Sequence, residues 1–496
     1  MPQRIFLSKS KIAAFEQCPK RLWLEIHRRD LAQVTPSTSA SFQVGHDVGA
    51  IACAAYPDGV MIAPDNDLTA ALQLTSDHLA QEIKRPLFEA TLSHEDVLVR
   101  VDLLIPHEDG WHMAEVKSTG GVKAYQLGDL ATQLWVARGA GIPISRASIR
   151  HIDTSFVYET QGDYERLLID ADIGEQVADL VATRREVVTA AKAVVAGPEP
   201  EVDVGDRCSD PFECQFMGHC NSGRPAPAAY PVTLLPGKAG KAAARTLLEA
   251  GLADLAQAPE GHPLLESFTR IHAATLTGVE FHDAAAFRTE LDDWTWPRFY
   301  LDFETISFAI PRWLRTRPYQ AIPFQFSCHI EQVTGDVQHH GFLDLSGQDP
   351  SEACAMALLA TLGQTGAIVT YNAAFERSCI LGLARRLPTL EAPLTALAGR
   401  IVDLLPVVRR HYYHRSMRGS YSIKAVLPAR LPQLSYADLD GVQDGMAAQE
   451  AYVEAVAEDT AVERKAQIRG QLEAYCTLDT WAMLQLARSL SSPREG

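Results

Sequence analysis

The chain has 496 residues, which at roughly 100 to 200 residues per domain is enough for two to four domains. Hydrophobic residues make up 47% and charged residues 22% of the chain, a composition that indicates a folded globular protein and excludes a disordered or fibrous one. The 45 basic and 62 acidic residues give a formal net charge of -17, which argues against a basic surface that coats nucleic acid non-specifically.

The sequence predicts a cytoplasmic protein without a membrane partner. No uninterrupted apolar run reaches the roughly eighteen residues that a membrane helix needs. The N-terminal residues turn polar after a short apolar stretch and lack the longer one of a secretory signal. The nine cysteines therefore predict metal ligands or buried thiols and not a disulfide framework.

Two strand-like segments carry the first group of candidate site residues. Leu98–Ile105 and Trp111–Ser118 flank a polar turn, which predicts a β-hairpin. Residues two apart in a strand face the same side, so Glu115 and Lys117 point into one site that Asp102 can reach from the adjacent strand. Two carboxylates can hold Mg²⁺ or Mn²⁺, and the lysine can orient or help deprotonate a water beside a phosphate. Solvated hairpin charges are the alternative interpretation.

Residues 7 to about 221 resemble the RecB-like PD-(D/E)xK nucleases, particularly the iron-sulfur branch that includes the CRISPR-associated exonuclease and the AddB helicase-nuclease. The resemblance rests on four segments and on the closing cysteines: Leu7–Glu25, Arg100–Leu104, Glu115–Lys117 and Gln133 in a helix-like stretch. It implies catalytic roles for Asp102, Glu115, Lys117 and Gln133, with the two acids binding Mg²⁺ or Mn²⁺.

Two positions depart from the pattern of that family. Gly49 stands where family members commonly have a metal-binding histidine in an early helix, so His46 is the candidate substitute and a surface histidine is the alternative. Ala137 stands where the Gln-x-x-x-Tyr pattern that begins at Gln133 has its tyrosine.

Four cysteines lie near the two ends of this region. Cys208, Cys214 and Cys220 are spaced six residues apart, and Cys18 precedes a proline. In the resembled nucleases, one N-terminal and three C-terminal cysteines ligate a 4Fe-4S cluster, so the resemblance implies the same for these four. A zinc ion held by the same four thiolates is one alternative. The other is that the four cysteines are buried and unrelated to one another. The other cysteines lie in apolar or Ala-rich settings and are predicted to belong to the core: Cys53, Cys328, Cys354, Cys379 and Cys476.

A stretch rich in Pro and Gly after Cys220 predicts a break in the chain. The predicted domains are therefore 1–221, a connector over 222–295, and 296–496. Within the connector, residues 233 to about 260 predict two short helices around a Gly turn. They weakly resemble a helix-hairpin-helix element, a backbone-phosphate binder in other proteins, and a plain helical connector is the alternative.

From Trp296 onward, strand-like apolar runs alternate with Ala- and Leu-rich helical stretches, which indicates an α/β domain. Asp302 and Glu304 lie two apart on a predicted strand and hence on one face. Adjacent like charges both stay ionised readily only if a cation lies between them. Further along, Glu376 lies near the start of a predicted helix, and Tyr475 and Asp479 lie four apart on one helix face.

The order of these residues resembles the DEDDy 3′-5′ exonucleases of the RNase H-like fold. Residues 297 to about 490 are similar to an uncharacterised bacterial domain family of that kind, often found behind a RecB-like nuclease. The resemblance implies that four acids bind two divalent metals and that Tyr475 positions the attacking water, the acids being Asp302, Glu304, Glu376 and Asp479. Glu376 stands where Asp is usual.

Three further residues are candidate contacts to nucleic acid. Asn372 precedes Glu376, and Arg418 and Lys424 lie in a later loop where they could grip phosphates. Solvated loop charges are the alternative for the two basic residues. Asp403, between these positions, is expected to support the fold.

Together the resemblances imply a PD-(D/E)xK restriction-endonuclease-like domain followed by an RNase H-like exonuclease domain. The expected function is metal-dependent hydrolysis of DNA ends or single strands, 3′-5′ in the C-terminal domain. The sequence does not distinguish DNA repair, phage defence and RNA processing as the pathway. The alternatives are an RNA exonuclease, or a non-catalytic protein that binds nucleic-acid ends and has one or both sites decayed. No Walker A phosphate loop is present in the sequence, so any unwinding would come from a partner helicase.

Overall fold

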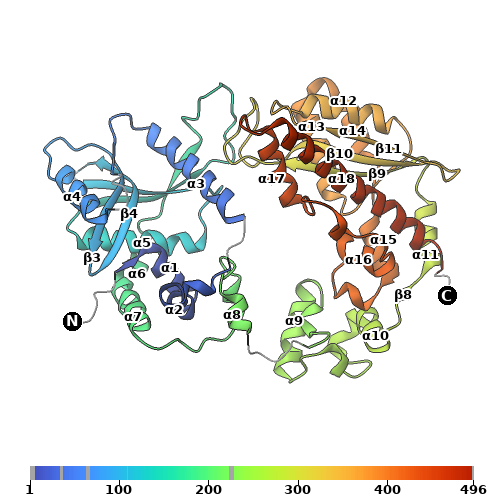
Figure 1. Ribbon diagram of the computed structural model, residues 1–496, viewed down its shortest axis with the longest axis horizontal. Coiled ribbons are helices and arrows are strands. Elements are labelled where there is room, and N and C mark those ends of the chain that lie inside the picture. The colour runs from blue at the N-terminus through green and yellow to red at the C-terminus, as the bar shows by residue number, and fades with distance from the viewer. Residues whose placement is uncertain (1–5, 34–36, 63–66, 109, 223–227, 494–496) are drawn as a thin grey trace. The chain divides into compact units, whose positions relative to one another are not determined.

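The computed structural model of the protein describes residues 6–33, 37–62, 67–108, 110–222 and 228–493. The chain forms two compact units (Figure 1). The first unit comprises residues 1–225 together with 308–319, and the second comprises residues 226–307 and 320–496. Both have mixed α/β structure, as the sequence indicates. Among the described residues, no helix combines the length and the apolar character needed to cross a membrane.

A seven-stranded sheet forms the centre of the first unit, with the order β2-β3-β4-β5-β6-β7 and with β1 paired to β4. Its strands are β1 (Leu7–Ser8), β2 (Val60–Met61), β3 (Leu87–His94), β4 (Val97–His107), β5 (Gly110–Lys117), β6 (Ile144–Ile152) and β7 (Leu168–Asp172). β4 and β5 form the antiparallel hairpin that the sequence predicts. Leu103 pairs with Ala114 in this hairpin, so Asp102 and Glu115 follow at neighbouring positions.

Helices cover both faces of this sheet. They are α1 (Lys9–Gln17), α2 (Pro19–His27), α3 (Ser37–Ala54), α4 (Leu68–Leu79), α5 (Ala124–Gly139), α6 (Ala178–Ala182), α7 (Arg184–Ala196) and α8 (Met217–Asn221), with the 3₁₀ helices η1 (Arg29–Leu31) and η2 (Asp206–Cys208). Ile12 of α1 and Leu134 of α5 are buried in one cluster with Met113. Ala52 of α3 packs with Ala114, the next residue of β5, which points to the opposite face.

Residues 308–319 complete the first unit although they lie far along the chain. Ala309 is buried with Val48 and Ile152 in one cluster. The hydroxyl of Tyr319 donates a hydrogen bond to the carbonyl of Ser118, directly after Lys117. The first unit is therefore discontinuous in sequence, a feature that the boundaries expected from composition do not contain.

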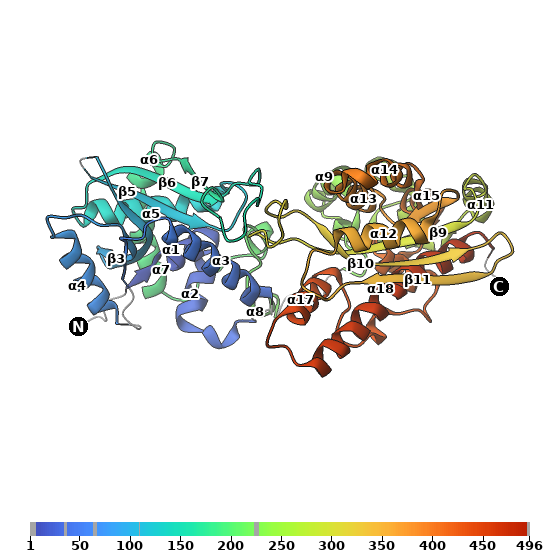
Figure 2. The same ribbon diagram turned by 90° about the horizontal axis from the view of Figure 1, so that it is seen from above.

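A five-stranded sheet forms the centre of the second unit, in the order β11-β10-β9-β12-β13 (Figure 2). Its strands are β9 (Arg298–Ile306), β10 (Ile322–Glu331), β11 (Val337–Leu343), β12 (Ala367–Thr370) and β13 (Ile401–Asp403), and a separate pair consists of β8 (Phe281–His282) and β14 (Tyr412–Tyr413). β10 is antiparallel to both of its neighbours, β9 and β11, whereas β12 is parallel to both β9 and β13.

The second unit has helices on both faces of this sheet and others, such as α9 (Gly237–Glu249) and α10 (Thr269–Thr277), beside it (Figure 1). The remaining helices are α11 (Ala284–Asp292), α12 (Ser351–Leu362), α13 (Ala374–Arg386), α14 (Glu391–Gly399), α15 (Leu404–His411), α16 (Ile423–Arg430), α17 (Gly445–Val456) and α18 (Val462–Leu490). Leu301 of β9 is buried with Leu358 of α12 and Ile380 of α13. Tyr300, its neighbour on β9, faces the other side and is buried with Val408 of α15 and Met483 of α18.

The predicted connector is folded and shares the core of the second unit. Val232, Leu247 and Ile271 lie in the same buried cluster as Tyr300 and Met483. The second helix expected there is a single 3₁₀ turn. The 3₁₀ helices of the second unit are η3 (Val232–Leu234), η4 (Leu255–Gln257), η5 (Pro263–Phe268), η6 (Pro388–Leu390), η7 (Arg415–Met417) and η8 (Tyr436–Asp438).

Candidate functional sites

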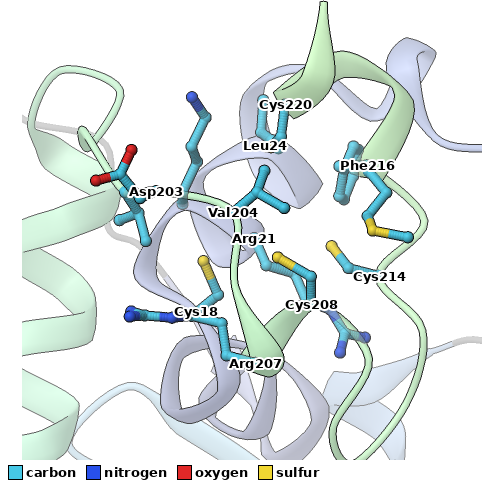
Figure 3. Close-up of a pocket in the computed structure, with 13 residues that line it drawn as sticks. Cys18, Arg21, Leu24, Asp203, Val204, Arg207, Cys208, Cys214, Phe216 and Cys220 are labelled. Carbon is cyan, nitrogen blue, oxygen red and sulfur yellow. The ribbon is translucent and has the colours of Figure 1, made fainter. Parts of the chain in front are cut away.

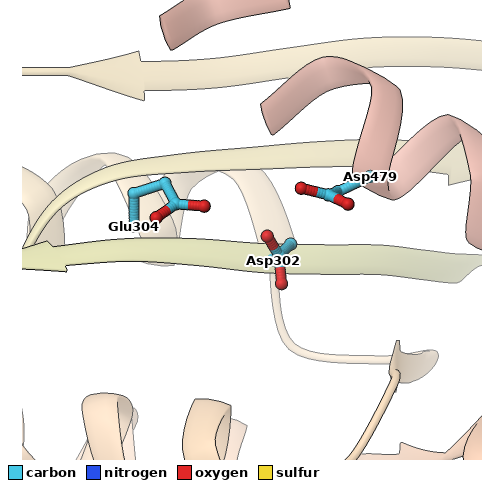
Figure 4. A group of neighbouring side chains, drawn as sticks. All are labelled: Asp302, Glu304 and Asp479. Atoms are coloured by element: carbon cyan, nitrogen blue, oxygen red, sulfur yellow. The ribbon is translucent and has the colours of Figure 1, made fainter. Parts of the chain in front are cut away.

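Three carboxylates meet in the second unit and form what we call the acid cluster: Asp302, Glu304 and Asp479. Each offers an oxygen, and these oxygens all lie within 4.8 Å of one another (Figure 4). Asp302 and Glu304 share a face of β9 because they are two residues apart, and Asp479 projects toward them from α18. Glu304 and Asp479 are only 7% and 8% exposed. This donor set fits Mg²⁺ or Mn²⁺, which prefer carboxylate oxygens.

Burial and mutual repulsion disfavour the charged form of these acids. Burial raises the pKa of Asp302 well above its usual value, and the charges of Asp479 and Glu304 raise it further. Burial, followed by the charge of Asp479, raises the pKa of Glu304 to about 8. Burial also raises the pKa of Asp479 to about 6. The cluster therefore retains protons near neutral pH unless a cation replaces them.

Two tyrosines and a lysine surround Asp479. The hydroxyl of Tyr436 donates a hydrogen bond to Oδ1 of Asp479 at 2.5 Å, and hydrogen bonds from Tyr436 and Tyr475 hold down the pKa of Asp479 against its burial. The Nζ atom of Lys424 lies 5.2 Å from the ring centroid of Tyr436 and 5.3 Å from that of Tyr475. The charge of Lys424 also lowers the pKa of Glu304. The predicted residues Tyr475 and Lys424 thus lie at the acid cluster.

Glu376 lies in the first turn of α13 and is only 3% exposed. Burial raises its pKa to about 8. Its charge contributes to the raised pKa of Asp302, so the two acids are neighbours, although Glu376 is not among the three whose oxygens lie within 4.8 Å. Within the described part of the chain, its Oε2 atom has no hydrogen-bond partner. A buried carboxylate oxygen without a donor suits a fourth metal ligand.

No hydrogen bond among the described residues joins the other two predicted contacts, Asn372 and Arg418, to the acids. Asn372 is exposed with a φ of 77°, and its N–H donates to Asp403, which also caps α15. Asp403 thus supports the turn before Glu376, as expected. Arg418 donates to the carbonyl of Ala229 at 3.0 Å and is not brought to the acid cluster by any contact among the described residues.

Six residues of the first unit form what we call the Glu115 cluster: Lys9, Asp102, Glu115, Lys117, Asp129 and Gln133. Oε1 of Glu115 pairs with Lys9 and lies 2.8 Å from Nζ of Lys117. Oε2 of Glu115 accepts a hydrogen bond from the amide of Gln133. Oδ2 of Asp102 accepts from the N–H of Val116 at 2.7 Å. The structure therefore brings together all four residues that the nuclease resemblance assigns to catalysis.

The two acids of the Glu115 cluster have opposite pKa shifts. Burial, reinforced by the charge of Glu115, raises the pKa of Asp102 to about 8. Burial also acts to raise the pKa of Glu115, but Lys9 and Lys117 outweigh it and lower that pKa to about 2. The pKa of Lys117 is raised because Glu115 and Asp129 outweigh its burial. Burial thus favours the neutral form of Asp102, whereas the two lysines favour the ionised form of Glu115.

His46 is exposed on α3, and no hydrogen bond or ion pair among the described residues joins it to Asp102 or Glu115. A Cβ atom added at Gly49 would meet nothing within 4 Å, so the fold leaves room for a side chain there. The Oε1 atom of Gln133 is buried without a hydrogen-bond partner within the described residues.

The four predicted cysteine ligands line one pocket of the first unit (Figure 3) and form the cysteine cluster: Cys18, Cys208, Cys214 and Cys220. All four are free and only partly exposed. Burial raises the pKa of Cys214 and Cys220, and nearby thiols contribute. Basic side chains also line the pocket and would offset thiolate charge: Lys20, Arg21 and Arg207. Four thiols at one pocket are the ligand type and number that a 4Fe-4S cluster takes. Among the described residues, no three of these sulfur atoms lie within 4.8 Å of one another, so they are not gathered as closely as the acid cluster.

The remaining cysteines divide as follows. Cys328, Cys354, Cys379 and Cys476 are buried, which confirms their predicted place in the core, whereas Cys53 is partly exposed. Sequence reasoning missed Lys9, Asp129 and Tyr436. The spacing of Asp129 and Gln133, one helical turn apart, is a signal that could have indicated Asp129.

Comparison with protein families matches residues 299–422 to a family described as a domain of unknown function, DUF2779. The match covers about a quarter of the chain. It includes Asp302, Glu304 and Glu376 and ends before Tyr475 and Asp479. No curated protein matches the chain.

Proposed function

We propose that the protein is a metal-dependent nuclease that hydrolyses phosphodiester bonds at DNA ends or in single-stranded DNA. The observation that carries this proposal is the acid cluster, in which three carboxylates from two distant segments converge with oxygens within 4.8 Å. Buried carboxylates that repel one another are costly without a cation, and divalent ions at such a site act on phosphates.

In the second unit, the acid cluster and Glu376 would hold Mg²⁺ or Mn²⁺, which supply charge stabilisation to the attacking and leaving oxygens. Tyr475, bonded to Asp479, orients the attacking water. Lys424 places a positive charge beside both tyrosines, where it can attract a phosphate of the bound strand. The likeness of this residue order to the DEDDy exonucleases supports 3′-5′ removal of nucleotides.

The first unit supports a second hydrolytic centre of the PD-(D/E)xK type. Asp102 and Glu115 would provide the metal ligands, and Lys117 would orient a water beside the phosphate. Gln133 holds the second oxygen of Glu115 and thereby fixes the orientation of the carboxylate. The cysteine cluster would hold a 4Fe-4S group, or zinc, with a structural role.

The proposal is tested with DNA and RNA single strands of one sequence, labelled at the 3′ or the 5′ end, with Mg²⁺, with Mn²⁺ and with EDTA. Lys117→Ala silences the first unit, and Asp302→Asn is then added to it. Loss of an indirect support of a metal site costs about 10- to 100-fold, so loss of the ligand Asp302 should reduce 3′ release by more than about 100-fold. Glu352→Gln, which makes the same type of change at an exposed position of α12, should leave the rate unchanged.

The alternatives give different results in the same experiment. Undiminished 3′ release by the double variant contradicts the assignment of the acid cluster. Degradation of RNA alone identifies an RNA exonuclease. Binding of ends without release of any nucleotide identifies a non-catalytic protein, and loss of both activities through Lys117→Ala alone shows that the two centres are not independent.

A further inference from the structure

Lys9 lies inside the Glu115 cluster although it comes from the beginning of the chain. β1 pairs in parallel with β4, with Leu7 opposite Val97, and this pairing fixes the backbone directly before Lys9. Ser8 caps α1 by accepting a hydrogen bond from the N–H of Lys11 at 3.3 Å. The strand and the cap together direct the first residue of α1 toward the site.

The ammonium group of Lys9 pairs with Oε1 of Glu115, and the charge of Asp102 also attracts it. Glu115 is only 1% exposed. Its Oε1 contacts Lys9 and Lys117, and its Oε2 accepts from Gln133. Both oxygens of the carboxylate are therefore engaged by donors. Oε1 has two donors, so an ion that binds this oxygen must displace Lys9 or Lys117. Lys117 comes from the same strand as Glu115, whereas Lys9 comes from α1.

We propose that Lys9 is a built-in competitor for the divalent ion of the first unit: its ammonium occupies the cation position between Glu115 and Asp102, and metal binding requires it to leave. This inference rests on the proposed function of the first unit. The site exchanges one positive charge for two when the ion binds. The side chain of Lys9 is 23% exposed, so it has a route toward solvent when it is displaced.

The competition predicts that the first unit binds divalent ions more weakly than its carboxylates alone would allow. A hydrogen bond to a charged group contributes about 1.5 to 3 kcal/mol, so removing the competing ammonium should tighten binding by about tenfold or more. The displaced ammonium group can then pair with a phosphate of the substrate. Lys9 would thus bind Glu115 in the metal-free protein and the substrate in the metal-bound protein.

The experiment measures binding of Mn²⁺ alone to the full chain by electron paramagnetic resonance of the free ion. All variants carry Asp302→Asn and Asp479→Asn, which remove two of the four proposed ligands of the second unit. Lys9→Met should bind Mn²⁺ about tenfold or more tightly than the chain with Lys9. Lys11→Met is the matched control, because Lys11 lies on the same helix, is 28% exposed and pairs with Glu25 at 2.7 Å. It should leave the affinity unchanged.

Two further variants separate charge from structure. Lys9→Arg keeps the positive charge and should keep the weak affinity, whereas Glu115→Gln added to Lys9→Met should abolish binding. Equal affinity with Lys9 and with Met at this position, or weaker affinity with Met, overturns the competition but leaves the metal site of the first unit in place. Absence of Mn²⁺ binding in every variant overturns both the inference and the proposed centre. Thermal denaturation of each variant confirms that it is folded.

Discussion

The carboxyl groups of the acid cluster have raised pKa values, and these pKa values make metal binding by the cluster depend on pH. The pKa of Glu304 is raised to about 8 and that of Asp479 to about 6, in both cases chiefly by burial. Because a ligand carboxylate must be deprotonated, metal binding releases protons and becomes tighter as pH rises. The same pKa shifts make the metal-free protein sensitive to pH.

Glu304→Gln should therefore change stability in one pH range only. The folded state holds a proton on Glu304 up to about pH 8, whereas the unfolded chain releases it near the usual pKa of 4.5, so stability falls as pH rises between these values. Glutamine cannot ionise, so the variant does not lose stability through this residue as pH rises. In EDTA, the variant should melt at a higher temperature than wild type at pH 8, by roughly 2 to 4 °C for each kcal/mol relieved, and at nearly the same temperature at about pH 4, below the usual pKa of 4.5.

Calorimetry at the two pH values checks this expectation, with Glu352→Gln on the exposed face of α12 as the control. Mn²⁺ should raise the melting temperature of wild type at pH 8 more than that of Glu304→Gln, because the ion replaces the missing protons in wild type. An equal shift of the variant at both pH values contradicts the assignment of a raised pKa to Glu304.

Single residues also show where sequence reasoning stops. Asp302 and Glu304 could be predicted as a pair because residues two apart in a strand point to the same face of the sheet. Lys9 and Tyr436 could not, because each reaches its carboxylate through tertiary contact and neither has a spacing that links it to the site. Lys9 lies in a segment that the nuclease resemblance includes, but the direction of its side chain depends on the pairing of β1 with β4.

At the scale of elements, the connection from β12 to α13 depends on one carboxylate from β13. Oδ1 of Asp403 accepts hydrogen bonds from the N–H groups of Asn372 and Leu405, each at 3.0 Å. Oδ2 accepts from the N–H of Ala373 at 3.0 Å. The carboxylate thus caps α15 and fixes the turn that precedes Glu376.

Asp403→Ala should destabilise the second unit by about 2 kcal/mol, the upper end for loss of a helix cap, because three N–H groups lose their acceptor. Urea denaturation measures the loss, and Asp403→Asn, which keeps one acceptor oxygen, should lose less. Mn²⁺ binding in a Glu115→Gln background should weaken as well, since Glu376 is no longer held in place. Unchanged stability and unchanged Mn²⁺ affinity in Asp403→Ala would show that the turn is held by other contacts.

For the molecule as a whole, the sequence predicted the α/β class and the hairpin that carries Asp102 and Glu115, because both follow from local periodicity. It did not predict that residues 308–319 complete the first unit, since a loop between two strands gives no local sign of its distant partners. The connector is a similar case. Its apolar face is visible in the sequence of α9, but its place in one buried cluster with Tyr300 and Met483 depends on the folded sheet.

The cysteine cluster brings together distant parts of the first unit, because Cys18 lies between α1 and α2 whereas the other three lie in the segment from η2 to α8. A metal centre there closes a loop of about 200 residues, which removes conformational entropy from the unfolded chain.

Protein purified without oxygen should be brown, with broad absorbance at about 400 nm and about four irons per chain. Cys214→Ser should bleach it and increase protease cleavage before residue 221, while 3′ release by the second unit continues. Cys53→Ser, outside the pocket, should keep the colour. Colourless protein with one zinc would replace the iron-sulfur group by a zinc site, and protein with neither metal would refute the ligand assignment.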